Sequence, residues 1–252
     1  MNPLRQANRL LRRGRAAVRE KGLVQTLRLI PSNLYYLATD FDVRHGTDTG
    51  MGGGGGHAPP EAHEGYEGTK PRIFHRTIRS LKIHPQAYTF VDLGSGKGRA
   101  LLLASHYPFR RIIGVEYLED LHNIAARNIK IYRARGRECQ RIETVCGDAG
   151  AFPMPEDALV IYMNNPFKAP VMERVLGNLR ASLETTPRDA IVIYQNPLQR
   201  ELLDNAPFLE LQAYRHHRTK GFRKMPIGRV AVYRACAPAA GSVGAAGSGT
   251  GP

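Results

Sequence analysis

Three glycines at alternate positions, Gly94, Gly96 and Gly98, stand where a short apolar run meets a helical pattern. The run before them, residues 88–93, is rich in strand-forming residues, and residues 99–105 have the apolar content of a buried helix start. A strand, a tight glycine turn and a helix N-terminus form a ready site for an anion or a nucleotide. The backbone can approach the ligand there, and the first helical N–H groups point toward it. This stretch therefore predicts a nucleotide-binding loop.

The spacing of the glycines separates three kinds of nucleotide loop. A phosphate loop would have a glycine at position 91 and a hydroxyl residue after Lys97, and the chain has neither. The dinucleotide fingerprint would have a small residue at position 99, which is arginine here. What remains is an acid, Asp92, two residues before Gly94. An acid at this position suits a ligand with an ammonium group better than a pyrophosphate.

Acidic residues also end the next two predicted strands. Glu116 ends the second and Asp148, followed by Ala149, ends the third. Ligands of open α/β sheets bind beyond the carboxyl ends of the strands, and a carboxylate such as Glu116 can accept hydrogen bonds from both hydroxyls of a ribose. Dinucleotide enzymes use the same device, so Glu116 alone does not discriminate. Three acids in register at consecutive strand ends predict one shared site.

The fourth predicted strand ends in Asn164-Asn165-Pro166-Phe167. Asn-Pro is a common turn dipeptide, so the segment is at least a turn. Amide and backbone oxygens placed here would also lie beside the glycine loop, where a substrate is expected.

The segment "VDLGSGKG", residues 91–98, resembles the first motif of the class I, seven-strand, S-adenosylmethionine-dependent methyltransferases. The resemblance implies that this loop wraps the amino-acid half of S-adenosylmethionine. It also implies that Asp148 binds the adenine amino group and that the backbone N–H of Ala149 meets a ring nitrogen. The alternative is a glycine turn with no ligand.

The segment "NNPF" is similar to the Asp/Asn/Ser-Pro-Pro-aromatic motif of methyltransferases that act on amino groups, with asparagine in place of the first proline. That difference brings it nearer to the non-SET histone-lysine methyltransferases, in which paired asparagines end the same strand. The resemblance implies that Asn164 and Asn165 grip the target nitrogen and that Phe167 stacks on it. Tyr162 and Tyr194 are further candidates for the pocket.

Two upstream segments have weaker resemblances. "YEGTKPRIF", residues 66–74, is similar to a Tyr/Phe-x-Pro-Thr segment of small seven-strand lysine methyltransferases, which implies cofactor contacts by Tyr66 and Thr69. "TDFDVRHGTDTG", residues 39–50, resembles a segment of uncharacterised bacterial methyltransferases. Its polar residues show no helical or strand period, which favours a substrate or lid loop; they are Asp42, Arg44, Thr47 and Asp48.

Alternating strand and helix patterns predict the elements that position these residues. Helices are expected over 71–82, around 121–129 and around 171–183, and strands over 88–93, 111–117, 141–148, 158–163 and 190–196. Two final strands, within 208–217 and 228–235, follow without a helix between them. The expected fold is therefore α/β, with a seven-stranded, mostly parallel, Rossmann-like methyltransferase sheet, helices on both faces and an N-terminal helical extension.

The 252 residues carry a formal net charge of +14, and residues 1–28 hold eight Lys/Arg against one Glu, a net +7. A basic amphipathic helix over 3–21 could bind nucleic acid, an acidic protein or an anionic membrane surface, or could simply be solvated. The expected domains are a basic helical extension (1–48), a Gly-rich flexible loop (49–65), the methyltransferase domain (66–235) and a disordered tail (236–252).

Cysteine usage and hydropathy argue against a disulfide-bonded, a zinc-binding and a membrane-spanning protein. The three cysteines form no C-x-x-C pair and no zinc-ligand spacing, so reduced thiols, a cytoplasmic location and no metal are expected. The sequence has no apolar run of 18 residues, so no transmembrane segment is expected.

The expected function is transfer of a methyl group from S-adenosylmethionine to nitrogen, in a protein lysine or a small-molecule amine. No general base is evident. An RNA methyltransferase that uses the basic arm remains an alternative, as does a catalytically silent cofactor-binding partner protein; a dinucleotide oxidoreductase is more distant.

Overall fold

The structure is a computed structural model that describes residues 41–50, 68–218 and 226–236. Tyr66, the basic segment 3–21, residues 51–65 and the tail from 237 lie outside the described residues. The helices are α3 (Phe41–His45), α4 (Pro71–Ser80), the 3-10 turn η1 (Pro85–Ala87), α5 (Arg99–Ala104), α6 (Glu119–Ile131), α7 (Ala169–Thr185) and α8 (Arg200–Asp204). The strands are β1 (Tyr88–Leu93), β2 (Arg111–Glu116), β3 (Ile142–Cys146), β4 (Ala158–Asn164), β5 (Ala190–Gln195), β6 (Leu209–Arg218) and β7 (Pro226–Ala235).

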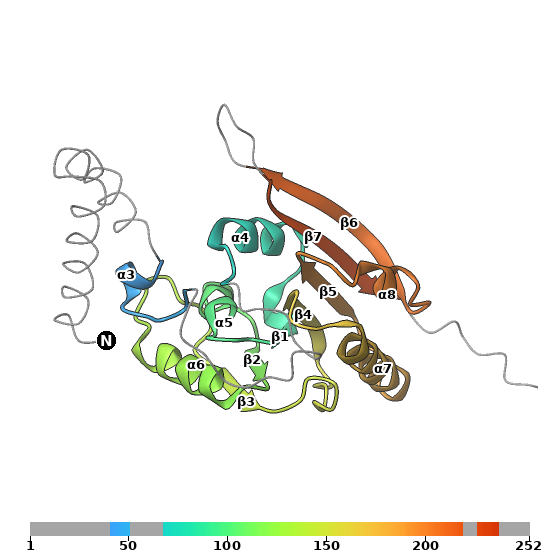
Figure 1. The fold of residues 1–252 in the computed structure, drawn as a ribbon, viewed down its shortest axis with the longest axis horizontal. Helices are drawn as coiled ribbons and strands as arrows, with labels where there is room; N and C mark the ends of the chain where they lie inside the picture. Colours follow the sequence, from blue (N-terminus) through green and yellow to red (C-terminus); the bar gives the residue numbers. More distant parts are fainter. Residues whose placement is uncertain (1–40, 51–67, 219–225, 237–252) are drawn as a thin grey trace, which may run out of the picture.

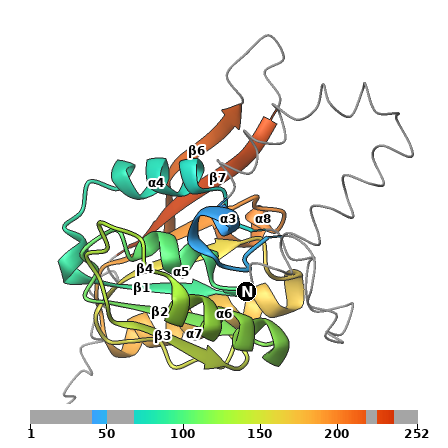
Figure 2. The ribbon, with the colours of Figure 1, turned by 90° about the vertical axis from the view of Figure 1, so that its left-hand side faces the viewer.

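Seven strands form one sheet in the order β3-β2-β1-β4-β5-β7-β6 (Figure 1). The first five run parallel, and β7 pairs antiparallel with both β5 and β6. The long β6–β7 hairpin forms one end of the sheet, as Figure 2 also shows. This arrangement confirms the expected seven-stranded, mostly parallel α/β sheet.

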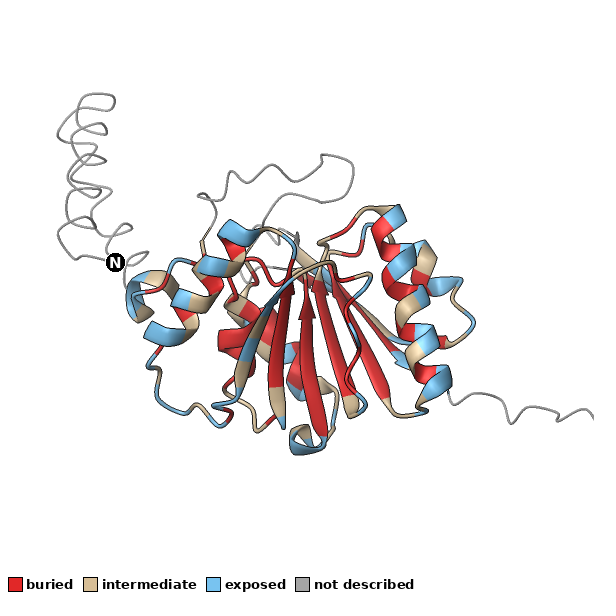
Figure 3. Ribbon diagram, turned by 90° about the horizontal axis from the view of Figure 1, so that it is seen from below, coloured by how far each residue is buried: buried red, intermediate tan, exposed pale blue. Residues whose placement is uncertain are grey.

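Both faces of the sheet are covered, which explains why the central strands read as continuous apolar runs. All six residues of β1 and all six of β5 are buried, and Figure 3 shows the central strands as buried along most of their length. Apolar residues of α7 and α8 complete the core on one face, and those of α4 and α5 complete it on the other.

The register of the parallel strands brings polar residues together at one edge. Asp92 of β1 lies beside Tyr162 of β4, and Asn164 at the end of β4 lies beside Gln195 of β5. Paired residues of neighbouring strands point to the same face. Because Tyr162 and Asn164 are two residues apart, all four side chains lie on the face covered by α4 and α5.

The boundaries differ from the sequence prediction mainly at weakly patterned ends. Helix α4 ends at Ser80 rather than at residue 82, and β3 covers Ile142–Cys146 rather than 141–148. β3 is an edge strand with three of its five residues exposed, so its apolar signal is weak.

Candidate active site

The glycine loop, residues 94–98, leaves β1 and leads into α5. Gly94, Gly96 and Gly98 all have positive φ, at 78°, 53° and 81°, a conformation that residues with a Cβ rarely adopt. A Cβ added at Gly94 would lie 2.3 Å from Cβ of Pro166, and one at Gly98 would lie 3.1 Å from Cβ of Ala125. At Gly94 glycine is therefore required by close protein packing, and at Gly98 it is favoured by the positive φ and by the tight contact with Ala125, in addition to any approach of a ligand. The contact with Pro166 places the glycine loop directly against the Asn-Pro turn of β4.

Glu116, at the carboxyl end of β2, is hydrogen-bonded to the backbone of the glycine loop. Its Oε2 accepts a hydrogen bond from the backbone N–H of Gly96 at 2.7 Å, and its Oε1 accepts one from Leu118 at 2.9 Å. The side chain is buried, so these charge-assisted bonds fix the loop strongly. Each carboxylate oxygen has more than one lone pair, and a hydroxyl of a ligand can share it with a backbone amide.

Asp92 is a buried carboxyl group with no hydrogen-bond donor among the described residues; it is 3% exposed. Burial raises its pKa well above the usual range, and the nearby negative charge of Glu116 raises it further. Two acids this close, with no described cation bonded to Asp92, are complementary to a positively charged ligand. These carboxylate acceptors therefore fit the ammonium-bearing half of S-adenosylmethionine.

Asp148 and Ala149 follow β3 at the same edge. Asp148 accepts hydrogen bonds from the backbone N–H of Gly150 and from Nη2 of Arg174, both at 2.8 Å. These bonds fix the orientation of its carboxylate. Ala149 is buried, and its backbone N–H has no acceptor among the described residues. A buried amide without a protein acceptor fits a ring nitrogen of a ligand.

Two Asn-Pro turns lie side by side at the ends of β4 and β5; we call them the paired turns, residues 164–167 and 195–198. Asn165 and Asn196 both precede a proline and both have positive φ, at 47° and 50°. Nδ2 of Asn196 donates to Oδ1 of Asn164 at 3.2 Å, and its backbone N–H donates to the carbonyl of Arg229 at 2.7 Å. The second turn was not predicted from the sequence, although it carries the same Asn-Pro signal after a strand.

The remaining predicted residues of this region are buried and support the paired turns. Oδ1 of Asn165 accepts from the hydroxyl of Tyr194 at 3.1 Å and from the backbone N–H of Leu198 at 3.4 Å. Phe167 is 3% exposed and packs in the core with Met163, so little of its ring is open to a substrate. Its Cε1 would lie 3.6 Å from a Cβ added at Gly94, so the ring adjoins the glycine loop.

A buried chain of hydrogen bonds joins Thr69, just before α4, to the sheet. Oγ1 of Thr69 lies 3.1 Å from the hydroxyl of Tyr162, and that hydroxyl donates to Oε1 of Gln195 at 2.9 Å. Because the tyrosine proton goes to Gln195, the threonine hydroxyl is the donor to Tyr162. This chain ties Thr69, which was predicted at the cofactor, to the strand ends that carry the paired turns.

Residues 41–50, which we call the N-terminal strap, are bonded to the start of α5. Oδ1 of Asp42 accepts from Oγ1 of Thr47 at 2.7 Å and from Oγ1 of Thr49 at 2.6 Å. Arg99 donates hydrogen bonds to two side chains of the strap. Its Nη2 lies 3.1 Å from Oδ2 of Asp42, and its Nε lies 2.6 Å from Oγ1 of Thr49. The polar side chains of Asp42 and Thr47, predicted to suit a substrate or lid loop, are thus bonded within the strap, and Arg44 is exposed.

The strap also contacts the glycine loop and α6. The buried Nζ of Lys97 donates to Oδ1 of Asp48 at 3.1 Å and to the carbonyl of Gly50 at 3.2 Å. Nδ2 of Asn128 donates to the carbonyls of Asp48 and Lys97, both at 2.9 Å. Thr49 lies next to Gly68. A Cβ added to Gly68 would lie 2.8 Å from the carbonyl oxygen of Thr49.

Other classes of site are not formed by the part of the chain that the structure describes. In residues 41–50, 68–218 and 226–236, no three His, Cys, Asp or Glu side chains gather where they could hold a metal ion. Within the same residues, the helices are too short or too polar to cross a bilayer.

One comparison with known protein families covers the region of the glycine loop. The family model for the histone methylation protein DOT1 matches residues 60–142, a stretch that contains the glycine loop and Glu116. No curated protein matches the chain.

Among solved structures, TrmN from Thermus thermophilus is 20% identical over 67% of this chain and 49% of its own, with a TM-score of 0.49. The chain therefore spans about half the length of that protein. A precorrin-6y C5,15-methyltransferase from Geobacter metallireducens is 16% identical over 67% of this chain and 88% of its own, with a TM-score of 0.47. A SAM-dependent methyltransferase from Methanosarcina mazei is 11% identical over 63% of this chain and 96% of its own, with a TM-score of 0.46.

The strand order, the glycine loop and the match to a methyltransferase family model define the class of the protein. The chain has the class I, seven-strand methyltransferase fold. The match over residues 60–142 supports methyl transfer as the activity and S-adenosylmethionine as the cofactor.

Proposed function

We propose that the enzyme methylates an amino nitrogen and that Asn164 orients this nitrogen. The observation that carries the proposal is the packing of the first of the paired turns, residues 164–167, against the glycine loop, where a Cβ on Gly94 would overlap Pro166. The turn that would contact the methyl acceptor is therefore packed directly against the loop that would bind the cofactor. S-adenosylmethionine supplies a methyl carbon on a sulfonium that is already a good leaving group, so alignment is the main demand on the protein.

Five features of the strand ends support a binding mode for the cofactor. We assign the ammonium group to Asp92, the ribose hydroxyls to Glu116, and the adenine to Asp148 and the amide of Ala149. The polar Gly94–Gly98 backbone would wrap the amino-acid half, with Thr69 beside it. Tyr66 remains a proposed contact outside the described residues.

The hydrogen bonds of the paired turns favour Asn164 over Asn165 as the residue that meets the acceptor. Oδ1 of Asn165 already accepts from two donors, and its positive φ shapes the turn. An amide oxygen accepts up to two hydrogen bonds. Nδ2 of Asn196 donates to Oδ1 of Asn164 and so orients its amide. An N–H of the acceptor bonded to this amide oxygen would turn the nitrogen lone pair away from Asn164.

The charge of the neighbouring side chains favours an acceptor that is neutral before the reaction. Asn165, Gln195 and Asn196, which adjoin Asn164, are amides without charge. An aromatic amine would meet this surface in its reactive form. A lysine would have to lose its proton first, and desolvation beside the buried turn would lower its pKa. We assign Phe167 to this apolar backing rather than to direct stacking.

Asn164→Ala tests the proposal. Because the substitution removes the orienting oxygen and leaves the Glu116 and Asp92 contacts in place, turnover should fall by about 100-fold or more. Affinity for S-adenosylhomocysteine should change by less than about tenfold. The assay follows tritium from labelled S-adenosylmethionine into protein, RNA and small molecules of a lysate from a strain that lacks the gene.

Two further variants make the result specific. Asn165→Gly tolerates the positive φ and should lose much less turnover than Asn164→Ala. Asn123→Ala, on the exposed face of α6, removes the same side chain far from the turns and should leave turnover unchanged. Full turnover in Asn164→Ala, or a labelled product that releases its methyl group in mild base as an ester does, would contradict nitrogen methylation.

A further inference from the structure

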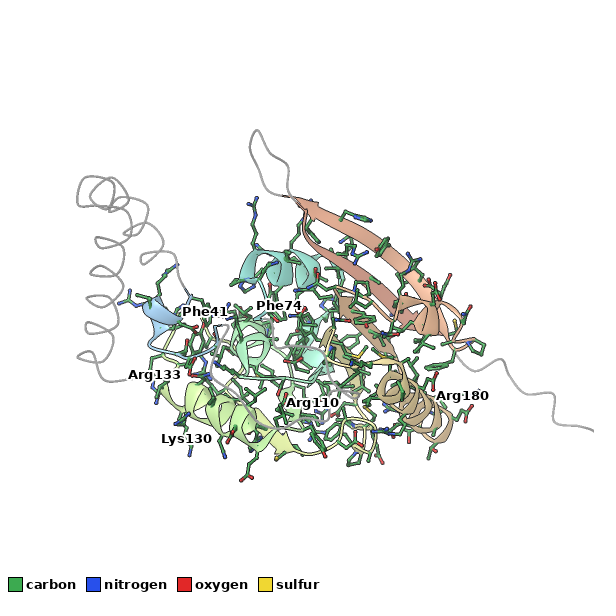
Figure 4. The ribbon with its side chains drawn as sticks, in the orientation of Figure 1. Phe41, Phe74, Arg110, Lys130, Arg133 and Arg180 are labelled. Carbon is green, nitrogen blue, oxygen red and sulfur yellow. The ribbon has the colours of Figure 1, made fainter. Side chains whose placement is uncertain are left out.

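The outer face of α4 is basic. Arg72, Arg76 and Arg79 are exposed and stand four and three residues apart, which places them on one side of the helix. The opposite side buries Ile73 and Phe74 with other core residues, so the helix cannot rotate to hide or pair these charges. Figure 4 shows the labelled Phe74 directed from α4 into the core.

One arginine of β6 extends this face. Nη1 of Arg215 donates to Oγ of Ser80, the last residue of α4, at 2.6 Å. Burial lowers the pKa of His217, and the positive charges of Arg76 and Arg215 lower it further, so both arginines lie in the neighbourhood of the same imidazole. Figures 1 and 2 both show α4 beside the β6–β7 hairpin. We call this set the α4 basic surface: Arg72, Arg76, Arg79 and Arg215.

The α4 basic surface has no acidic partner in the described residues. None of its four arginines lies in an ion pair there, and the chain has no Asp or Glu between positions 68 and 91. By contrast, Arg180 of α7 and Arg234 of β7 are paired with carboxylates. Like charges gathered without partners create a positive field that attracts an anion.

The same helix adjoins the paired turns. An added Cβ on Gly228 of β7 would lie 3.0 Å from Cδ1 of Ile73 and 3.5 Å from Oδ1 of Asn196. Gly228 is therefore packed between the start of α4 and the second Asn-Pro turn. Thr69, one residue before Lys70 and α4, reaches the sheet through Tyr162. The start of α4 therefore lies beside the second Asn-Pro turn.

We propose that the α4 basic surface binds the phosphate backbone of a nucleic acid. Guanidinium groups bind phosphate through two parallel hydrogen bonds, and a strand offers about one charge per 3.4 Å, so each arginine can meet a phosphate. A membrane surface fits less well, because an interfacial helix inserts apolar side chains and those of α4 are buried in the core. That this nucleic acid also carries the acceptor amine rests on the nitrogen methylation proposed above; the binding does not.

The test compares two full-length variants that each lose four positive charges. The surface variant carries Arg72→Gln, Arg76→Gln, Arg79→Gln and Arg215→Gln. The control variant carries Arg127→Gln, Lys130→Gln, Arg133→Gln and Arg135→Gln, which are exposed residues on and after α6. Figure 4 shows Lys130 and Arg133 at the opposite end of the molecule from the β6–β7 hairpin.

Fluorescence anisotropy with a labelled 20-nucleotide single-stranded RNA, and with a duplex DNA of the same length, measures binding over a series of salt concentrations. The surface variant should lose at least about tenfold in affinity, and its plot of log K against log salt should be shallower by about 3, from about 0.7–0.9 per phosphate contact. The control variant should stay within about threefold of the wild type. Calorimetry with S-adenosylhomocysteine should show unchanged cofactor binding in both, which also reports that both are folded.

Three results would overturn the proposal. Equal losses in the two variants would mean that only net charge attracts the probe. Competition by poly-glutamate as strong as that by RNA would assign the surface to an acidic protein, and binding to anionic vesicles that depends on the same four arginines would assign it to a membrane. Arg76→Gln alone, at an exposed helical position, repeats the comparison if the surface variant does not fold. Loss of RNA binding without loss of the Asn164-dependent methyl transfer would leave the proposed function standing.

Discussion

Glu116→Ala should destabilise the protein because this carboxylate holds the glycine loop. The substitution removes the hydrogen bonds from the backbone N–H groups of Gly96, at 2.7 Å, and Leu118, at 2.9 Å. Hydrogen bonds to charged groups contribute about 1.5–3 kcal/mol each, so these two account for about 3–6 kcal/mol. Water can reach the half-buried Leu118, and Asp92 loses a like charge that raises its pKa, which together offset part of the loss. We expect the free energy of unfolding to fall by about 2–4 kcal/mol.

Urea denaturation followed by circular dichroism measures this change, and calorimetry with S-adenosylhomocysteine measures the second effect on the same samples. Affinity should fall by about 1–3 kcal/mol, because the ribose hydroxyls lose their proposed acceptor and the loop is less ordered before binding. Glu143→Ala, which removes an exposed carboxylate from β3, is the matched control and should stay within about 0.5 kcal/mol of the wild type. The reasoning fails if Glu116→Ala is as stable as this control and binds the ligand equally well.

Three shorter predictions concern the paired turns, the glycine loop and the pH dependence of folding. Asn196→Asp removes the amide that donates to Asn164, so turnover should fall about tenfold or more in the wild-type background. The same substitution should hardly change turnover in Asn164→Ala, and the kinetics of the double-mutant cycle measure the difference. Gly94→Ala should lower the free energy of unfolding in urea by about 2–4 kcal/mol, because of its positive φ and overlap with a proline, whereas Gly177→Ala in α7 should raise it by about 0.5–1 kcal/mol. Burial lowers the pKa of His75, so below about pH 6.5 the unfolded chain binds more protons than the folded chain. The free energy of unfolding should therefore decline as the pH falls from about 7 to 5, and His75→Gln should make the decline shallower.

Strands that are buried on both faces could be located from the sequence because each of their residues belongs to one continuous apolar run. β1 has the predicted limits of 88–93, and β4 and β5 each differ by one residue at the end. β3 was harder to place, since an edge strand with exposed positions has no continuous apolar run. The parallel direction of the first five strands followed from the alternation of helices and strands, and the final hairpin from the missing helix between its strands.

The strand-end residues of the candidate site could be predicted for a related reason. Parallel strands end at one edge, so the types of residue after each strand are informative without any knowledge of contacts. Asn196 carried this signal and was missed because only the first Asn-Pro turn matched a known motif. The links from Asp42 to Arg99 could not be predicted, since a side-chain network that joins residues 57 positions apart leaves no period in the sequence.

Thr49 and Gly68, which are 19 positions apart in the sequence, lie next to each other, and the side chain of Arg99 contacts both. Both ends of the intervening connection are therefore fixed by the folded domain, whatever the number of residues between them. A side chain at position 68 would meet both the Thr49 carbonyl, at 2.8 Å, and the Arg99 guanidinium, at 3.0 Å. A single added methyl group there would therefore loosen the strap and the start of α5 together.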